Sequence, residues 1–319
     1  MNPTTPFIMK TAPNKLFFAA LLRGKDFRVY ATLIVAAAAM LISGSGRAAG
    51  LTSELFLTVD PTTTSASVVG IQGTTVLLNV PQSPTPQGQS PIAVSSTVRT
   101  LGFGAGNSYV GAEYTLAGVP TGSTYPFPAA LGTEEVDDGT TDGSFNYTWG
   151  VTSGIAYRLN LDWTNPVPLF TLGNASGSRL GITYDASNNS LWIAGFAGAI
   201  GTLISDYSLS GTLLSSFNIG HGFSGALALN PADGTLWLSN LVSGGTLTLE
   251  QYARSAPGSF GATQSMLSSQ THPGISDGAF GGEFRYTGTV VPEPSTVLLA
   301  AIGVIIGFAL RRVRSGRNA

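Results

Sequence analysis

The sequence predicts an all-β body built from repeats of about 45 residues, in the manner of a β-propeller. The 41 glycines and 18 prolines indicate many turns. Short stretches alternate apolar with polar residues between these turns, as in 53–59, 154–159 and 245–250. No amphipathic helix of three turns is evident. A two-sheet β-sandwich is the alternative.

The repeat is visible in four residues, Asp185, Leu191, Trp192 and Tyr207, which recur about 45 positions later as Asn230, Leu236, Trp237 and Tyr252. Apolar strands are expected before each Asx turn, at 181–184 and 226–229. A period of ~40–45 residues is typical of a propeller blade of four strands. A body at 50–290 then holds roughly five blades, and Leu55 to Val59 can close the ring by completing the last blade.

Two tryptophans, Trp192 and Trp237, occupy equivalent positions, which predicts packing between blades. Trp149 and Trp163 fit the repeat less regularly, and stacking of one of them on a glycan is an alternative. The proline-rich segment from Pro81 to Pro91 should interrupt strands and form a surface loop or linker.

The distribution of charge excludes a nucleic-acid-binding body. Of the 17 acidic residues, all but Asp26 and Glu293 lie between Leu51 and Val290, beside five arginines and no lysine, so the net charge there is 5 − 15 = −10. Such a body cannot neutralise phosphates. The absence of cysteine excludes disulfides and thiolate chemistry.

The first 49 residues read as a signal peptide. A basic region precedes an apolar run from Tyr30 to Ile42, and small residues follow, so signal peptidase is expected to cut after Ala48 or Ala49. Met9 is an alternative start, and an uncleaved membrane anchor is the alternative interpretation.

The C-terminal region combines three elements in a fixed order. Pro292, Glu293 and Pro294 end regular structure. The uncharged residues 297–310 are expected to form a single transmembrane helix, which is short against the ~20 residues that span a hydrocarbon core. Arg311, Arg312 and Arg314 then act as a stop-transfer element, which leaves a basic cytoplasmic tail at 315–319 and the body outside the cytoplasmic membrane.

This order of elements resembles the PEP-CTERM sorting signal, over residues 291–314. The resemblance implies export by a Gram-negative bacterium, and recognition by an exosortase that cuts near Pro292–Pro294 and passes the protein onward to the cell surface or the medium. It also implies an association with exopolysaccharide and biofilm. An ordinary tail anchor with a proline-rich stalk is the alternative.

Candidate chemistry in the body is sparse. His221 and His272 are the only histidines and are both expected in loops rather than as metal ligands. No nucleotide-binding or hydrolase motif is present. The acidic run 134–138 with Asp142 is the best ion candidate, with Asp137, Asp138 and Asp142 as weak Ca²⁺ ligands, but a solvated acidic turn is the favoured interpretation.

Three functions follow from these observations. We expect a non-enzymatic surface or matrix protein, without catalytic residues or cofactors, whose partners are signal peptidase, exosortase, the membrane and an extracellular polysaccharide. The second is an exported glycan hydrolase or lyase that uses Asp137, Asp138 or Asp142. The third is a periplasmic protein that stays permanently tethered to the membrane.

Overall fold

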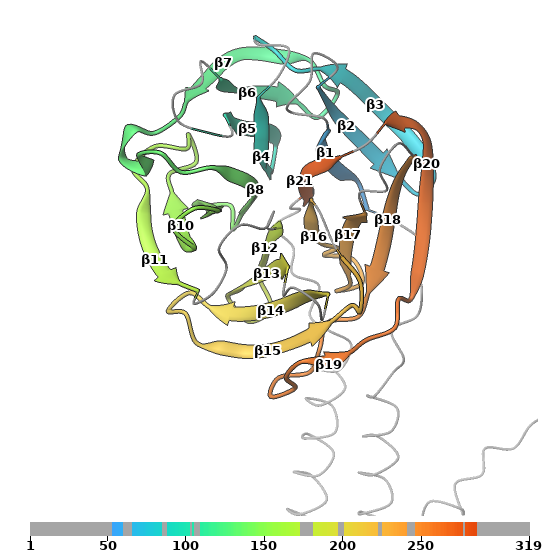
Figure 1. Cartoon of the computed structure of the whole chain (residues 1–319). Helices are drawn as coiled ribbons and strands as arrows, with labels where there is room; N and C mark the ends of the chain where they lie inside the picture. Colours follow the sequence, from blue (N-terminus) through green and yellow to red (C-terminus); the bar gives the residue numbers. More distant parts are fainter. Residues whose placement is uncertain are drawn as a thin grey trace, which may run out of the picture. The chain divides into compact units, whose positions relative to one another are not determined.

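The body is a five-bladed β-propeller in the computed structural model (Figure 1). The structure describes residues 53–59, 66–84, 88–102, 104, 109–172, 181–196, 201–222, 225–240, 246–276 and 278–285. The predicted signal peptide, the residues matching the sorting signal and the cleavage sites at Ala48 and Ala49 lie outside these ranges, as does the expected helix at 297–310. Within them, no helix has the length and apolarity needed to cross a membrane.

Each blade is an antiparallel sheet of four strands, to which blade 4 adds one short parallel strand, and the strands run in order from the centre of the ring to the outer edge (Figure 1). Blade 1 contains, from the centre outward, β21 (Ala279–Phe284), β1 (Leu55–Val59), β2 (Ser67–Gln72) and β3 (Thr75–Pro81). Blade 2 contains β4 (Gln89–Val94), β5 (Thr97–Gly102), β6 (Val110–Thr115) and β7 (Pro120–Pro126).

The other three blades follow in chain order. Blade 3 contains β8 (Val136–Thr141), β9 (Asn146–Gly150), β10 (Ile155–Leu159) and β11 (Val167–Thr171), preceded by the short 3-10 helix η1 (Ala129–Leu131). Blade 4 contains β12 (Gly181–Asp185), β13 (Ser190–Phe196), β14 (Thr202–Ser208), β15 (Leu213–Asn218) and an added β19 (Ala262–Thr263). Blade 5 contains β16 (Leu227–Leu229), β17 (Leu236–Asn240), β18 (Thr246–Tyr252) and β20 (Ser268–Ser276).

Ring closure differs in detail from the prediction. The first strand does pair with a C-terminal strand, because Leu55 lies opposite Phe284 and Leu57 opposite Gly282. However, three strands of the closing blade come from the N-terminal side, so the last strand completes the first blade. The closing strand β21 is the innermost of its sheet, which places it against the other blades at the centre.

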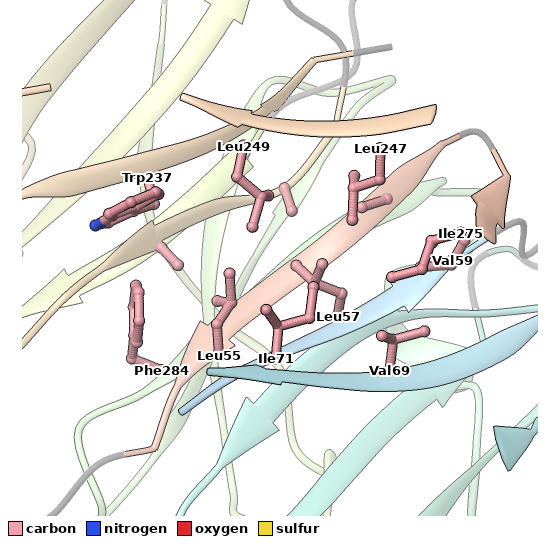
Figure 2. Close-up of a cluster of buried hydrophobic side chains, with 13 residues drawn as sticks. Leu55, Leu57, Val59, Val69, Ile71, Trp237, Leu247, Leu249, Ile275 and Phe284 are labelled. Atoms are coloured by element: carbon pink, nitrogen blue, oxygen red, sulfur yellow. The ribbon is translucent and has the colours of Figure 1, made fainter. Parts of the chain in front are cut away.

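The apolar core is divided among the five junctions between neighbouring blades, with one buried cluster at each. At the closing junction, Trp237, Leu247 and Leu249 of blade 5 meet Leu55 and Phe284 of blade 1 (Figure 2). Since each blade buries both faces only when it has two neighbours, closing the ring is what completes the core.

All four tryptophans are buried at these junctions. Trp192 packs against blade 5 and Trp237 against blade 1, which confirms the predicted packing. Trp149 in β9 packs in the same way against blade 4, and each of these three lies seven positions after an Asp or Asn at the end of the innermost strand. Trp163, in the turn after β10, packs between blades 2 and 3. With 1% exposure or less, none can stack on a glycan.

The proline-rich segment is only partly the surface loop expected. Pro81 ends β3, and Pro91 lies within β4, the innermost strand of blade 2, where Gln89 and Ser90 are fully buried. Pro91 is tolerated because the pairing of β4 with β5 shifts register between Gln89 and Ile92. A bulge of this kind places proline where the ladder needs no N–H donor.

Candidate functional site

The aspartates of the acidic run lie in a buried inner strand and not in a solvated turn, whereas Glu135 just before the strand is exposed. Asp137 and Asp138 lie in β8, 3% and 0% exposed, and Glu134 just before it is 8% exposed. The sequence suggested a turn because it has four acids beside a glycine. Strand β8 instead contains a register shift between Val136 and Gly139, which directs the Asp138 side chain toward the other blades.

The Asp138 carboxylate joins the innermost strands of four blades. Its Oδ1 accepts hydrogen bonds from the backbone N–H groups of Gly139 and Gly282, at 2.7 and 2.9 Å. Its Oδ2 accepts from those of Ile182 and Leu227, both at 3.0 Å. Burial raises the pKa of Asp138 well above its ordinary value of 3.8, while these four donors act in the opposite direction. Both oxygens are occupied, so Asp138 has a structural role.

A second acid, Glu283 of the closing strand, is buried near Asp138. Burial raises its pKa well above the ordinary value of 4.5, a hydrogen bond from the Thr140 side chain opposes this shift, and the charge of Asp138 adds to it. The two acids therefore belong to the polar centre of the ring. No group of three His, Cys, Asp or Glu side chains suited to a metal ion occurs among the described residues.

The third predicted ion ligand, Asp142, stabilises a turn. Its Oδ1 accepts hydrogen bonds from the backbone N–H groups of Ser144 and Phe145, both at 2.7 Å, and its Oδ2 accepts one from the Tyr147 hydroxyl at 2.7 Å. The structure therefore does not bring Asp137, Asp138 and Asp142 together in one ligand set, because Asp138 faces the centre and Asp142 follows the end of the strand.

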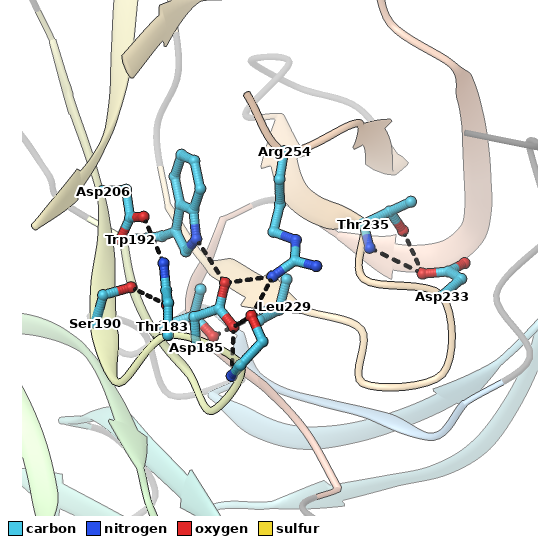
Figure 3. Close-up of polar contacts among 11 residues, drawn as sticks. Thr183, Asp185, Ser190, Trp192, Asp206, Leu229, Asp233, Thr235 and Arg254 are labelled. Atoms are coloured by element: carbon cyan, nitrogen blue, oxygen red, sulfur yellow. Dashed lines mark hydrogen bonds and ion pairs between the residues drawn. The ribbon is translucent and has the colours of Figure 1, made fainter. Parts of the chain in front are cut away.

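Asp185 occupies in blade 4 the position that Asp142 has in blade 3, seven residues before the tryptophan. It forms a contact between blades 4 and 5 (Figure 3). Its carboxylate accepts hydrogen bonds from Trp192 Nε1 at 3.1 Å and from the hydroxyl of Ser187, and it forms an ion pair with Arg254. Burial alone would raise the pKa of Asp185, but Arg254 and the hydrogen bonds from Ser187 hold it below its ordinary value. Arg254 also donates to the Ser187 hydroxyl at 2.9 Å.

His221 forms a partly exposed cluster of titratable side chains with Glu250 and Tyr252. It lies between β15 and β16, and its side chain is 42% exposed, as expected for a turn. Its Nε2 lies 3.2 Å from both Tyr252 Oη and Glu250 Oε2. Tyr252 in turn donates to Glu250 Oε2 at 3.0 Å, and Asn240 donates to Glu250 Oε1 at 2.9 Å.

This His221–Glu250–Tyr252 cluster offers donors and acceptors without a nucleophile. Burial, together with the Glu250 charge and hydrogen bond, raises the pKa of Tyr252, so its hydroxyl stays a donor at neutral pH. The exposed His221 ring is the part of this cluster that a ligand can reach, because Glu250 and Tyr252 are buried. The sequence did not reveal it, because Glu250 and Tyr252 lie about 30 residues from His221 and reach it only across the junction of two blades.

The second histidine, His272, is not in a loop as expected. It lies within β20 opposite Leu247 and is 1% exposed. Burial lowers its pKa below the ordinary 6.5, so the ring is neutral near pH 7.

Comparison with known proteins gives separate matches for the C-terminal region and for the propeller body. The PEP-CTERM protein-sorting motif matches residues 290–314. No protein of curated function matches the sequence. Solved structures with a similar arrangement include a chain of a nidogen/laminin complex, at 11% identity and a TM-score of 0.44, covering 74% of this chain and 98% of that one.

Two enzymes are also among the similar structures. Virginiamycin B lyase from Staphylococcus aureus matches at 15% identity and a TM-score of 0.36, covering 60% of this chain and 64% of the lyase. Myxococcus xanthus glutaminyl cyclase matches at 12% identity and a TM-score of 0.38, covering 62% of this chain and 71% of the cyclase. Likenesses this distant carry no argument about activity. It is residues 290–314 that identify the chain, as a protein carrying the PEP-CTERM sorting motif.

Proposed function

We propose that this protein is an exported, non-enzymatic surface or matrix protein with a binding or structural role toward extracellular polysaccharide. The observation that carries the proposal is the PEP-CTERM motif at 290–314, joined to a body in which the carboxylates of Asp138 and Asp142 are occupied by hydrogen bonds within the fold. The motif implies an exosortase as the processing enzyme. Signal peptidase removes the first 48 or 49 residues, and the residues 297–310 hold the body outside the membrane until processing.

The body supports binding better than catalysis. Asp138 and Asp142 use both carboxylate oxygens for hydrogen bonds inside the fold, so neither is available as the acid or base of a glycosidase. In the His221–Glu250–Tyr252 cluster, the exposed His221 ring is the hydrogen-bonding group that a ligand can reach. A polysaccharide offers many hydroxyl groups to such a cluster.

Mass determination of the mature C-terminus, on membrane and medium fractions of the producing cell, tests the sorting step. Cleavage near Pro292–Ser295 is expected, and replacement of Pro292 and Pro294 by alanine should leave the C-terminus intact. Arg317→Ala lies outside the matched residues and serves as the control that is still processed. A mature form of the wild type that retains Arg312 would mean permanent tethering.

The binding role is tested with the protein body purified from the same cells. Glycan-array binding by the body without release of products is expected, and His221→Ala should weaken it about tenfold, corresponding to ~1.4 kcal/mol. Release of soluble sugars that disappears in Asp142→Ala would favour the hydrolase or lyase instead.

A further inference from the structure

The outer edge of blade 1 differs from the outer edges of the other four blades. An edge strand presents unpaired backbone N–H and C=O groups, and proteins usually protect it with proline, charge or a covering segment. Blade 3 has Pro168 within β11 and blade 5 has Pro273 within β20. Blade 2 has proline at both ends of a polar β7, and in blade 4 the edge of β15 is paired with β19.

Strand β3 has none of these protections along Thr75–Val80. Its sequence there is Thr-Val-Leu-Leu-Asn-Val, without proline or charge, and only Pro81 ends it. In the described part of the chain β3 pairs with β2 alone. Val76 and Leu77 are 38% and 47% exposed, the apolar side chains that a lone edge strand would normally avoid.

The exposed apolar surface extends onto blade 2. Val119, in the turn between β6 and β7, is 58% exposed. A Cβ atom on the neighbouring Gly118 would lie 3.1 Å from Val80 and 3.5 Å from Leu78, which places this turn beside β3. Val119 therefore lies beside the face of β3 that carries Leu78 and Val80, whereas Val76 and Leu77 point to opposite faces of the strand. The outer edge of β3 with these three exposed apolar side chains, Val76, Leu77 and Val119, is here called the β3 edge.

Charge identifies the occupant. The body carries a net charge of 5 − 15 = −10, so two copies repel one another over most of their surfaces. The sequence from Pro61 to Val98, which contains β2, β3 and β4, has no charged residue at all. An uncharged apolar edge strand is self-complementary, because two copies can pair antiparallel about a two-fold axis.

We infer that the β3 edge is the site at which a second copy of this chain binds, by antiparallel pairing of β3 with β3. The two blades then form one continuous sheet across the dimer. The second copy covers Val76 and Leu77 of the first, and the reverse. The contact involves the uncharged edge alone, so the acidic surfaces of the two copies do not face each other. The inference does not depend on the sorting tail or on a polysaccharide ligand.

The natural absence of cysteine permits a direct test by cross-linking of the full-length protein in its own membranes. Single cysteines at Leu77 and at Asn79 lie near the centre of the paired strands, where opposite Cα atoms are ~4.5–5.5 Å apart, within the range of a disulfide. A covalent dimer is expected under mild oxidation with at least one of them. Leu213→Cys, in β15 and similarly exposed at 39%, should remain monomeric, because the edge that follows it from Leu214 to Asn218 is already hydrogen-bonded to the segment 258–264.

A second pair of variants distinguishes a specific dimer from cross-links that form in random encounters between copies. Adding Val76→Lys to the cross-linking variants should reduce the dimer about tenfold, because it places a charge within an uncharged apolar strand that the second copy must cover. Leu213→Lys is the matched control and should leave the yield unchanged, and thermal unfolding checks that both variants are folded. Absence of a dimer from both cysteine variants, or a yield that Val76→Lys does not change, would overturn the inference, even if the C-terminus is processed as proposed.

Discussion

At the scale of single residues, Asp138 holds the propeller together at its centre. One carboxylate receives four backbone N–H groups from the innermost strands of four blades. Buried N–H groups without a partner cost free energy, so Asp138 replaces hydrogen bonds that the crowded centre cannot otherwise supply.

Replacing Asp138 by asparagine should destabilise the fold by on the order of 3 kcal/mol, because an amide NH₂ would face two N–H donors that lose their acceptor. Denaturant unfolding measures the change. Asp142→Asn is the matched control, since Asp142 bonds only within its own turn and strand, and a loss of ~1 kcal/mol is expected there. Equal losses in the two variants would contradict a central role for Asp138.

Glu283 should make stability depend on pH. Its pKa is raised in the folded protein by burial, so the folded state binds this proton more tightly than the unfolded state. The contribution is fully present below the ordinary pKa of 4.5 and is lost as pH rises through the folded pKa. Glu283→Gln cannot titrate, so the wild type should lose free energy of unfolding relative to the variant as pH rises above about 5. Parallel pH profiles of the two proteins would refute this.

At the scale of strands and turns, neighbouring blades are joined by side chains that bond to the backbone of the next blade. Thr58 donates to the Ser90 carbonyl, and Tyr184 N–H donates to Thr140 Oγ1. Leu229 N–H donates to Thr183 Oγ1 at the next junction. Hydroxyl groups suit this task because they can both donate and accept a hydrogen bond.

The ion pair between Arg254 and Asp185 makes the corresponding contact between blades 4 and 5. Arg254→Ala should cost about 2–4 kcal/mol at pH 7, because Asp185 is 1% exposed and would keep a buried charge without its partner. The pKa of Asp185 is lowered in the fold, so this contribution is lost as pH falls below about 4. Urea unfolding at pH 7 and pH 3 should show a large difference from the wild type only at pH 7.

Arg285→Ala is the control for that experiment. Arg285 lies 3.7 Å from Glu54 and its side chain is 48% exposed, so its loss should change the free energy of unfolding by less than ~0.5 kcal/mol. A comparable loss in both arginine variants would show that charge removal in general, and not the junction, is responsible.

At the scale of the whole molecule, the ring is closed by β21, which lies between blades 5 and 2 at the centre. A Cβ atom on Gly281 would approach the Ser90 carbonyl oxygen to within 2.1 Å, and one on Gly282 would meet Ala226 at 2.6 Å. The closing strand therefore fits only because these two residues lack side chains.

Gly281→Ala should weaken ring closure, with a loss of roughly 2–4 kcal/mol, because the added methyl group meets rigid backbone. Limited proteolysis should then cut between blade 5 and β21 sooner than in the wild type. Gly70→Ala in the same blade meets side-chain atoms of Leu78 and Phe56 at 3.0–3.4 Å, which can shift, and should cost less. A Gly281→Ala protein as resistant as the wild type would argue against this account of closure.

The sequence by itself determined the class of fold, the repeat and the sorting motif, because each of these depends on residues near one another in the chain. The equivalent positions of Trp192 and Trp237 predicted their packing between blades, whereas the same role of Trp149 in blade 3 became clear only in the structure. The residues 290–314 match the motif without reference to any fold.

Only the tertiary structure decided what the acids and histidines do. The sequence around Asp138 favours a solvated turn. In the structure Asp138 is buried and accepts hydrogen bonds from the N–H groups of Gly282 and Leu227, which lie far along the chain. His221 meets Glu250 and Tyr252 only across a junction between blades, and His272 becomes buried in β20, which pairs with β18 within blade 5. Burial and hydrogen bonding between distant segments depend on ring closure, which local patterns of residues do not encode.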